Sequence, residues 1–185
     1  MQNDDWFVIA LDTDYHADEI RLYQDGNLDL RQLKFLDDLL ASSTKKRRTI
    51  LFTHHNGLSV DGAPSTALWG QIQPRFANRE LWWYWRHAHA GVVYSDRITV
   101  PGRGNAIYPH SCGHGAIPAG APDSLVSNPA AVWHETSKAS ALLYPERVRN
   151  GFAMLDLNGR ELNETFVNED GTKVFTRILP LGNTQ

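Results

Sequence analysis

The chain has 185 residues, of which 42% are hydrophobic and 21% charged, and its formal net charge is −3. This balance predicts a single domain over residues 1–185 with a sizeable core, and it excludes the basic surface that binding to duplex nucleic acid requires. The only cysteine, Cys112, excludes an intrachain disulfide; because neither a signal peptide nor a membrane-spanning run is recognised, we expect a cytoplasmic protein.

The N-terminal part of the chain predicts a β-α-β unit. Residues 6–11 form a nearly continuous apolar run, which is typical of a strand buried on both faces. A helix is predicted over residues 29–42, where leucines recur at helical spacing and Asp29 with Gln32 forms a capping-box-like start. A strand over residues 49–53 follows, and we expect it to pair in parallel with the first strand through a right-handed crossover.

The middle of the chain predicts one short helix and one further buried strand. A loop rich in glycine and proline, residues 56–64, leads to a short helix over residues 65–72, which Pro74 ends. The apolar run at residues 81–85 predicts the next strand. Two short strands are predicted around a turn, at residues 92–94 and 97–100.

The C-terminal part predicts loops followed by antiparallel strands. Residues 101–128 are rich in glycine and proline, and we expect them to form loops. Asn158-Gly159 and Asp170-Gly171 are strong hairpin signals. The strands that they join are predicted over residues 152–157, 161–168 and 172–179. The fold class is therefore α/β (α+β), with a mixed sheet, flanking helices and C-terminal antiparallel hairpins.

Three histidines follow two of the predicted strands. His54 follows the strand at residues 49–53, and His87 and His89 follow the strand at residues 81–85. Ligands bind at the carboxyl ends of strands in open α/β sheets, and alternate side chains of an extended segment share one side. Imidazole is a good ligand for zinc, iron or manganese. The pattern predicts a divalent-metal site, and the alternative is solvated loop histidines or hydrogen-bonded core residues.

Two segments carry a resemblance to a known family. Residues 50–56 resemble the strand-His motif of calcineurin-like metallophosphoesterases, and residues 83–89 resemble their Gly-His-x-His motif. The order of predicted elements also follows that family over most of residues 6–179. The resemblance implies a partial metallophosphoesterase-type β-sandwich with flanking helices. It also implies hydrolysis of a phosphomonoester or phosphodiester by two metal ions, Mn, Fe or Zn, which activate a bridging hydroxide.

The resemblance assigns roles to single residues. His54 and His87 would bind one metal ion, and His89 would bind the other. His55 would lie behind the ligands or on the substrate side. Arg86 stands at the family's glycine position, so its guanidinium either contacts a phosphate oxygen or faces solvent.

The resemblance covers only the C-terminal half of the family's domain. We assign no segment of this chain to the earlier motifs, which supply the bridging aspartate, the other carboxylate and asparagine ligands, and the histidine that protonates the leaving group. Asp12 and Asp14 end the first strand, but their surroundings resemble a later Leu-Asp-Thr segment, so we expect polar residues of a strand-end turn. The metal centre is therefore expected to be incomplete, and the expected partners are a phosphate ester and either an N-terminal half chain or a second copy. No residue is assigned as catalytic.

Several alternatives remain open. The chain is alternatively an inactive remnant, an interaction module that docks through an exposed sheet edge, or a mononuclear three-histidine zinc hydrolase. His110, Cys112 and His114 alternate in a glycine-rich segment whose spacing differs from standard zinc motifs, so we expect a surface loop there, in which His114 is the candidate for facing a substrate. The tryptophans at residues 82, 83 and 85 are expected to fill a core.

Overall fold

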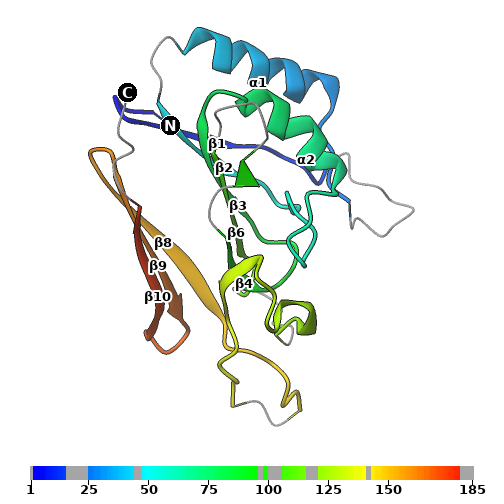
Figure 1. Cartoon of the computed structure of the whole chain (residues 1–185), viewed down its shortest axis with the longest axis vertical. Helices are drawn as coiled ribbons and strands as arrows, with labels where there is room; N and C mark the ends of the chain where they lie inside the picture. Colours follow the sequence, from blue (N-terminus) through cyan, green and yellow to red (C-terminus); the bar gives the residue numbers. More distant parts are fainter. Residues whose placement is uncertain are drawn as a thin grey trace.

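The fold is built from two β-sheets and a small set of helices. The computed structural model describes residues 2–15, 25–43, 47–95, 98–99, 106–115, 121–140 and 143–179. The larger sheet contains β1 (Trp6–Ala10), β2 (Arg48–Phe52), β3 (Glu80–Trp85), β4 (Gly91–Tyr94), β5 (Ile98–Thr99), β6 (Ala106–Cys112) and β7 (Ala131–His134). The smaller sheet contains β8 (Gly151–Asn158), β9 (Glu161–Asn168) and β10 (Lys173–Leu179) (Figure 1). The predicted mixed α/β class with C-terminal antiparallel strands is confirmed.

The larger sheet is parallel in one half and antiparallel in the other. Its strand order is β1-β2-β3-β6-β4-β7, with β5 beside β6. Strands β1, β2, β3 and β6 run parallel, whereas β4 pairs antiparallel with β6 and with β7. The predicted parallel pairing of the first two strands is confirmed. Strand β1 lies at the edge of the sheet, and its side chains are buried on both faces as expected: Trp6 packs toward the smaller sheet and Phe7 and Ile9 pack on the helical face, whereas Ala10 at the end of the strand is exposed.

The helices cover one face of the larger sheet. Helix α1 (Leu30–Ser42) begins with the predicted capping box, in which the Asp29 side chain accepts from the Gln32 backbone N–H and the Gln32 side chain accepts from the Asp29 N–H. Helix α2 (Ala67–Ile72) continues into the 3-10 turn η2 (Gln73–Phe76). Pro74 lies within that turn and does not end the helical segment. Proline fits there because the first turn of a helix leaves its N–H groups without intrahelical partners.

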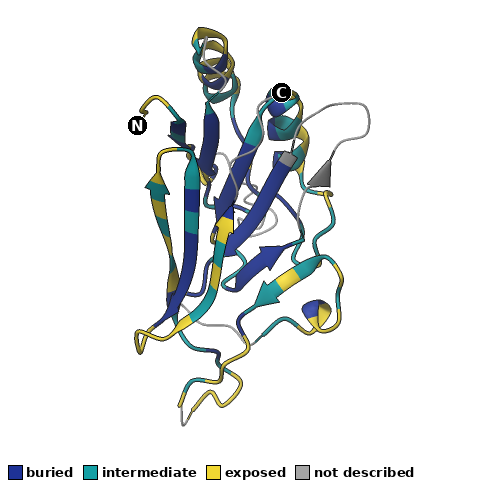
Figure 2. Cartoon of the chain, turned by 60° about the vertical axis from the view of Figure 1, so that its left-hand side comes forward, coloured by how far each residue is buried: buried dark blue, intermediate teal, exposed yellow. Residues whose placement is uncertain are grey.

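Strand β3 shows how the sequence divides the core into two layers. Trp83 and Trp85 pack in the cluster on the helical face, with Leu36 and Ile72. Trp82 packs in the other cluster, against residues of the smaller sheet such as Leu162. Successive strand side chains point to opposite faces, so a strand that is apolar throughout is covered on both sides. Figure 2 shows the resulting buried centre, and the prediction that the tryptophans fill a core is confirmed.

Strand β6 was not predicted from the sequence. The expectation of loops over residues 101–128 is wrong for Ala106–Cys112, which lies between β3 and β4. Pro109 stands opposite Trp83 in this strand. A proline in a central strand is rare because it cannot donate to the ladder, so the local sequence argues against a strand that the tertiary structure nevertheless forms. Strand β7, just beyond this range, was also missed.

The smaller sheet follows the predicted hairpins closely. Its order is β10-β9-β8, and both pairings are antiparallel. Gly159 and Gly171 have φ values of 56° and 84°, the left-handed conformation that glycine adopts without a Cβ penalty. Leu162 and Leu179 of this sheet are buried with Trp6 and Ile50 of the larger one, so the two sheets pack against each other. Among the described helices, none combines the length and apolar character needed to cross a membrane.

Candidate metal centre

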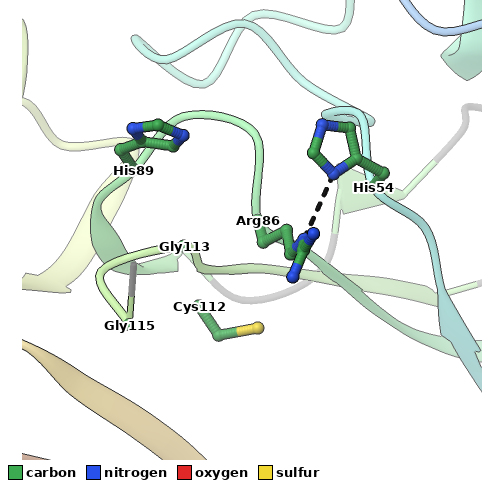
Figure 3. Close-up of a pocket in the computed structure, with 6 residues that line it drawn as sticks. All are labelled: His54, Arg86, His89, Cys112, Gly113 and Gly115. Carbon is green, nitrogen blue, oxygen red and sulfur yellow. Dashed lines mark hydrogen bonds between the residues drawn. The ribbon is translucent and has the colours of Figure 1, made fainter. Parts of the chain in front are cut away.

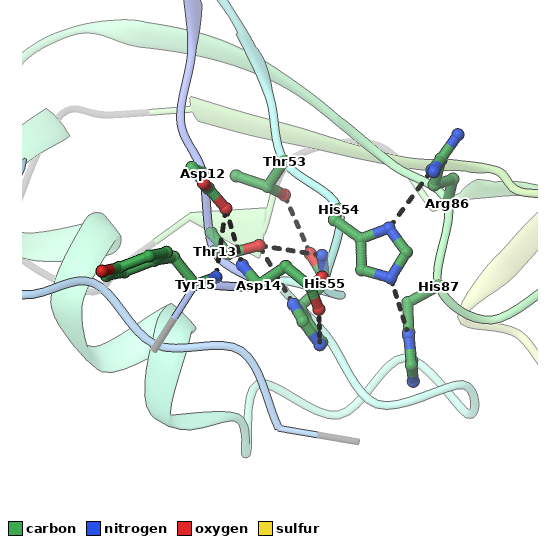
Figure 4. A network of polar contacts seen from close by, with 9 residues as sticks. All are labelled: Asp12, Thr13, Asp14, Tyr15, Thr53, His54, His55, Arg86 and His87. Atoms are coloured by element: carbon green, nitrogen blue, oxygen red, sulfur yellow. Dashed lines mark hydrogen bonds and ion pairs between the residues drawn. The ribbon is translucent and has the colours of Figure 1, made fainter. Parts of the chain in front are cut away.

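The site lies where β2 and β3 end. His54 and His55 follow β2, and His87 follows β3 two residues after Trp85. The parallel pairing of these strands brings their carboxyl ends together. The carbonyl oxygen of His54 accepts from the backbone N–H of both Arg86 and His87, at 3.1 and 2.9 Å. Backbone contacts therefore hold the two histidine-bearing segments side by side (Figure 4).

Three imidazoles meet at this point. His54 Nε2 lies 3.1 Å from His87 Nδ1. The His55 ring stacks on the His87 ring with centroids 4.7 Å apart. One ring nitrogen from each of the three histidines lies within 4.8 Å of the others. The structure thus brings together the predicted pair His54 and His87, and it adds His55, which we had expected behind the ligands or beside the substrate.

The three imidazoles are suitable ligands for a divalent ion, and one of the distances between their nitrogens is close to that of a zinc site. Zinc binds imidazole nitrogen at about 2.0–2.1 Å in tetrahedral geometry, so two such nitrogens lie about 3.3 Å apart. The 3.1 Å separation between His54 Nε2 and His87 Nδ1 is close to that value. The third nitrogen, within 4.8 Å, would have to move closer to share the ion. The structure therefore brings two ring nitrogens close together and places a third imidazole beside them.

Burial and neighbouring imidazoles keep this pair neutral. The pKa of His54 is lowered by desolvation and then by the adjacent His55. The pKa of His87 is lowered by desolvation and then by His55 and His54. Metal ions bind the neutral imidazole, so a lowered pKa favours metal binding near neutral pH.

His55 is anchored from behind by the segment that follows β1. Its Nδ1 lies 3.1 Å from Thr13 Oγ1, and the same oxygen accepts from the His55 backbone N–H. Its Nε2 lies 3.9 Å from a carboxylate oxygen of Asp14. The ring of His55 is almost fully buried. His55 is therefore the most firmly held member of the cluster.

Asp14 is a site residue that the sequence reasoning missed. Asp12 accepts from the backbone N–H of Asp14 and Tyr15, so the expected strand-end turn is present. Asp14, however, faces His55 from this turn. A usable signal was the tripeptide Asp14-Tyr15-His16, in which a carboxylate precedes a histidine by two residues just beyond a strand. His16 lies outside the described residues.

His89 lies apart from the cluster. Residues 86–89 form a turn, closed by the His89 N–H donating to the Arg86 carbonyl, and His89 has a φ of 50°. The backbone is not extended here, so the argument that His87 and His89 point to the same side does not apply. His89 instead lines a pocket of about 250 Å³ (Figure 3). The pocket is lined by His54, Arg86, His89, Cys112, Gly113 and Gly115.

Arg86 connects this pocket to the cluster. Its guanidinium Nε–H donates to His54 Nδ1 at 3.2 Å, while the side chain remains exposed. The two expectations for Arg86 were a phosphate contact or a solvent-facing position. In the structure the Arg86 side chain is exposed to solvent and also contacts His54.

His110 and His114 are buried rather than placed in a surface loop. Both are 0% exposed, and His110 lies within β6. The His114 ring packs against Phe166 and against the backbone of Gly151, where a Cβ would lie 2.5 Å from the His114 Nε2. Neither ring nitrogen of His114 has a hydrogen-bond partner among the described residues. The expectation of a surface loop, in which His114 was the candidate for facing a substrate, is therefore wrong.

Acidification should destabilise the fold partly through His114. Desolvation lowers the pKa of His114, so the unfolded chain takes up a proton at a higher pH than the folded chain does. This difference lowers the free energy of unfolding as the pH falls from 6.5 to 5.5, by at most about 1 kcal/mol. We expect His114→Gln to flatten that slope in urea unfolding at the two pH values. Identical slopes for wild type and variant would contradict the expectation.

Comparison with known proteins supplies no family for this chain. No protein-family model matches the sequence, and no curated protein matches it at a significant level.

Proposed function

We propose that the chain binds a divalent metal ion between His54 and His87 and takes part in the hydrolysis of phosphoric esters. It would do so as the part of a metallophosphoesterase-type centre that carries histidine ligands. The observation that carries the proposal is the 3.1 Å approach of two neutral imidazole nitrogens from the ends of adjacent parallel strands. Metal-bound water is a nucleophile near neutral pH, and the metal also stabilises charge on a phosphoryl oxygen.

The choice of phosphoric esters rests on the two sequence motifs and on the pocket. A guanidinium pairs well with phosphate because its N–H groups can donate to two oxygens. Arg86 provides such a group beside His54, and the described residues that line the pocket include no carboxylate that would repel an anion. Arg86 and the pocket would therefore bind and orient the phosphoryl group.

The centre is proposed to be incomplete in carboxylates. Asp14 is the carboxylate that the structure places near His55, at 3.9 Å, and it is largely exposed. Among the described residues no carboxylate belongs to the histidine cluster itself. A two-metal centre needs bridging oxygens, so we expect slow turnover by this chain and faster turnover only when another chain or segment supplies them.

Hydrolysis of bis-p-nitrophenyl phosphate with manganese tests the proposed activity. We expect slow, manganese-dependent release of p-nitrophenolate, which His87→Ala lowers by about a hundredfold because a ligand is lost. His134→Ala, a half-buried histidine on β7, is the matched control and should retain the rate. Equal rates for His87→Ala and wild type would contradict the proposal, and fast turnover by wild type would contradict the incomplete centre.

A second candidate is a mononuclear zinc hydrolase. It is favoured by one observation: ring nitrogens of His54, His55 and His87 gather within 4.8 Å, so three imidazoles could hold one zinc ion with an open fourth position. Zinc content after dialysis separates the two candidates. One zinc ion retained per chain supports the mononuclear site, whereas loss of the metal supports the incomplete two-metal centre.

A further inference from the structure

The contacts of Arg86 fix the direction of a hydrogen-bond chain through the cluster. Arginine can only donate, so His54 Nδ1 accepts from Arg86 Nε–H with its lone pair. Neutral His54 therefore carries its proton on Nε2. That N–H points at His87 Nδ1, 3.1 Å away, which in turn accepts. His87 then carries its own proton on Nε2.

In this arrangement no ring nitrogen of His54 or His87 has a free lone pair for a metal ion. The hydrogen-bond chain occupies the lone pairs of His54 Nδ1 and His87 Nδ1, and Nε2 of each ring is protonated. For His54 Nε2 to bind a metal ion, the proton must move to His54 Nδ1. That nitrogen would then face the Arg86 Nε–H, so two donors would oppose each other. If His54 Nδ1 binds the metal ion instead, the Arg86 guanidinium must move away from that nitrogen.

Either route requires the hydrogen bond from Arg86 to His54 to break. Metal-bound histidines normally donate their second N–H to a carboxylate or carbonyl, and Arg86 offers the opposite polarity. In the described parts of the chain no carboxylate forms an ion pair with Arg86 that could hold the guanidinium elsewhere. Its side chain is exposed and lines the pocket with His89 and Gly113. An anion in this pocket would give the displaced guanidinium a partner.

We propose that Arg86 couples anion binding to metal binding: a phosphoryl dianion in the pocket takes the guanidinium and frees His54 for a divalent ion. The inference rests on the proposed function, because it takes His54 as a metal ligand. Coupling between two sites is reciprocal, so the metal ion also raises the affinity for the anion. The site would then assemble with its phosphoryl ligand, and the free chain would hold the metal ion weakly.

Zinc titrations with and without methylphosphonate, a dianion that is not hydrolysed, test the coupling. In wild type we expect saturating methylphosphonate to tighten zinc binding by about tenfold, or 1.4 kcal/mol. Arg86→Met, which has similar length and no donor, should bind zinc about tenfold more tightly without the anion and should show less than about twofold coupling. Arg31→Met removes a positive charge from a side chain that is 91% exposed on α1, and it should behave like wild type.

The outcomes separate the possible explanations. Equal coupling in wild type and Arg86→Met means that the anion binds the metal ion directly, and it overturns the role of Arg86. A gain in zinc affinity in Arg31→Met equal to that in Arg86→Met means that net charge alone acts, and it also overturns that role. Failure of all three proteins to bind zinc, with or without the anion, overturns the proposed function.

A metal-free measurement tests the role of Arg86 by itself. Long-range proton–nitrogen NMR spectra of the histidine rings distinguish the two neutral forms of imidazole. In wild type we expect His54 to carry its proton on Nε2, and we expect methylphosphonate or Arg86→Met to shift His54 toward the form protonated on Nδ1. An unchanged His54 in both cases overturns the proposal even if zinc binds.

Discussion

Replacing Glu164 by glutamine should lower the free energy of unfolding by about 3–5 kcal/mol. Glu164 is 0% exposed on β9, between the two sheets. Its Oε1 accepts from the Tyr84 hydroxyl at 2.8 Å and lies 3.3 Å from His110 Nε2. Its Oε2 lies 3.3 Å from a guanidinium nitrogen of Arg177. Glutamine keeps the shape of this side chain but removes the negative charge that faces Arg177 in this buried network.

Chemical denaturation of wild type and variant measures the effect of Glu164. Glu169→Gln is the matched control, because Glu169 pairs with Arg147 at 3.0 Å at the surface, where both side chains stay partly exposed. Exposed pairs contribute less than about 1 kcal/mol, so the control should unfold close to wild type. Similar losses for the two variants would show that the buried network contributes no more than a surface pair.

The same network sets an acid limit on stability. Burial alone would raise the pKa of Glu164, but His110, Arg177 and the Tyr84 hydroxyl outweigh it and lower the pKa below its ordinary value. A carboxylate with a lowered pKa stabilises the fold above its ordinary pKa, and this contribution is lost as the pH falls through the lowered value. The difference between wild type and Glu164→Gln should therefore shrink below about pH 4.

Replacing His87 by alanine should weaken zinc binding by about a hundredfold or more. The loss follows because His87 Nδ1 and His54 Nε2 form the close nitrogen pair, so one imidazole remains where two converged. His87 is only half-buried, and the folded structure should survive the substitution. Isothermal titration calorimetry of wild type and variant measures the change.

His89→Ala is the informative companion to this variant. The family resemblance makes His89 a metal ligand, whereas the structure places it in the pocket, apart from the cluster of His54, His55 and His87. We expect zinc affinity to fall by less than about tenfold in His89→Ala. An equal loss in His87→Ala and His89→Ala would mean that the turn at residues 86–89 rearranges to bring both histidines to the metal ion.

The elements with a strong local signal were predictable from the sequence. The apolar runs that became β2 and β3 are long enough to specify strands, and the Asp29 capping box fixed the start of α1. Strand β6 was not predictable, because Pro109, His110 and Ser111 are poor strand residues. Its central position depends on pairing with β3 and β4, which local sequence does not encode.

The site was predictable only in part for a similar reason. His54 and His87 follow apolar strands, and parallel pairing brings such strand ends together. His89 lies in the turn after β3, so the expected alternation, which needs an extended backbone, does not bring it to the same side as His87. The buried network of Glu164 joins side chains far apart in sequence, so no local pattern indicates it.

A zinc titration followed through the histidine ring nitrogens by NMR tests the central claim most directly. We predict that the ring resonances of His54 and His87 change together and reach a plateau with the bound ion, while those of His110 and His114 keep their positions because both rings are fully buried and neither belongs to the cluster of His54, His55 and His87. Unchanged resonances of His54 and His87 at saturating zinc would contradict the claim that this pair binds a metal ion.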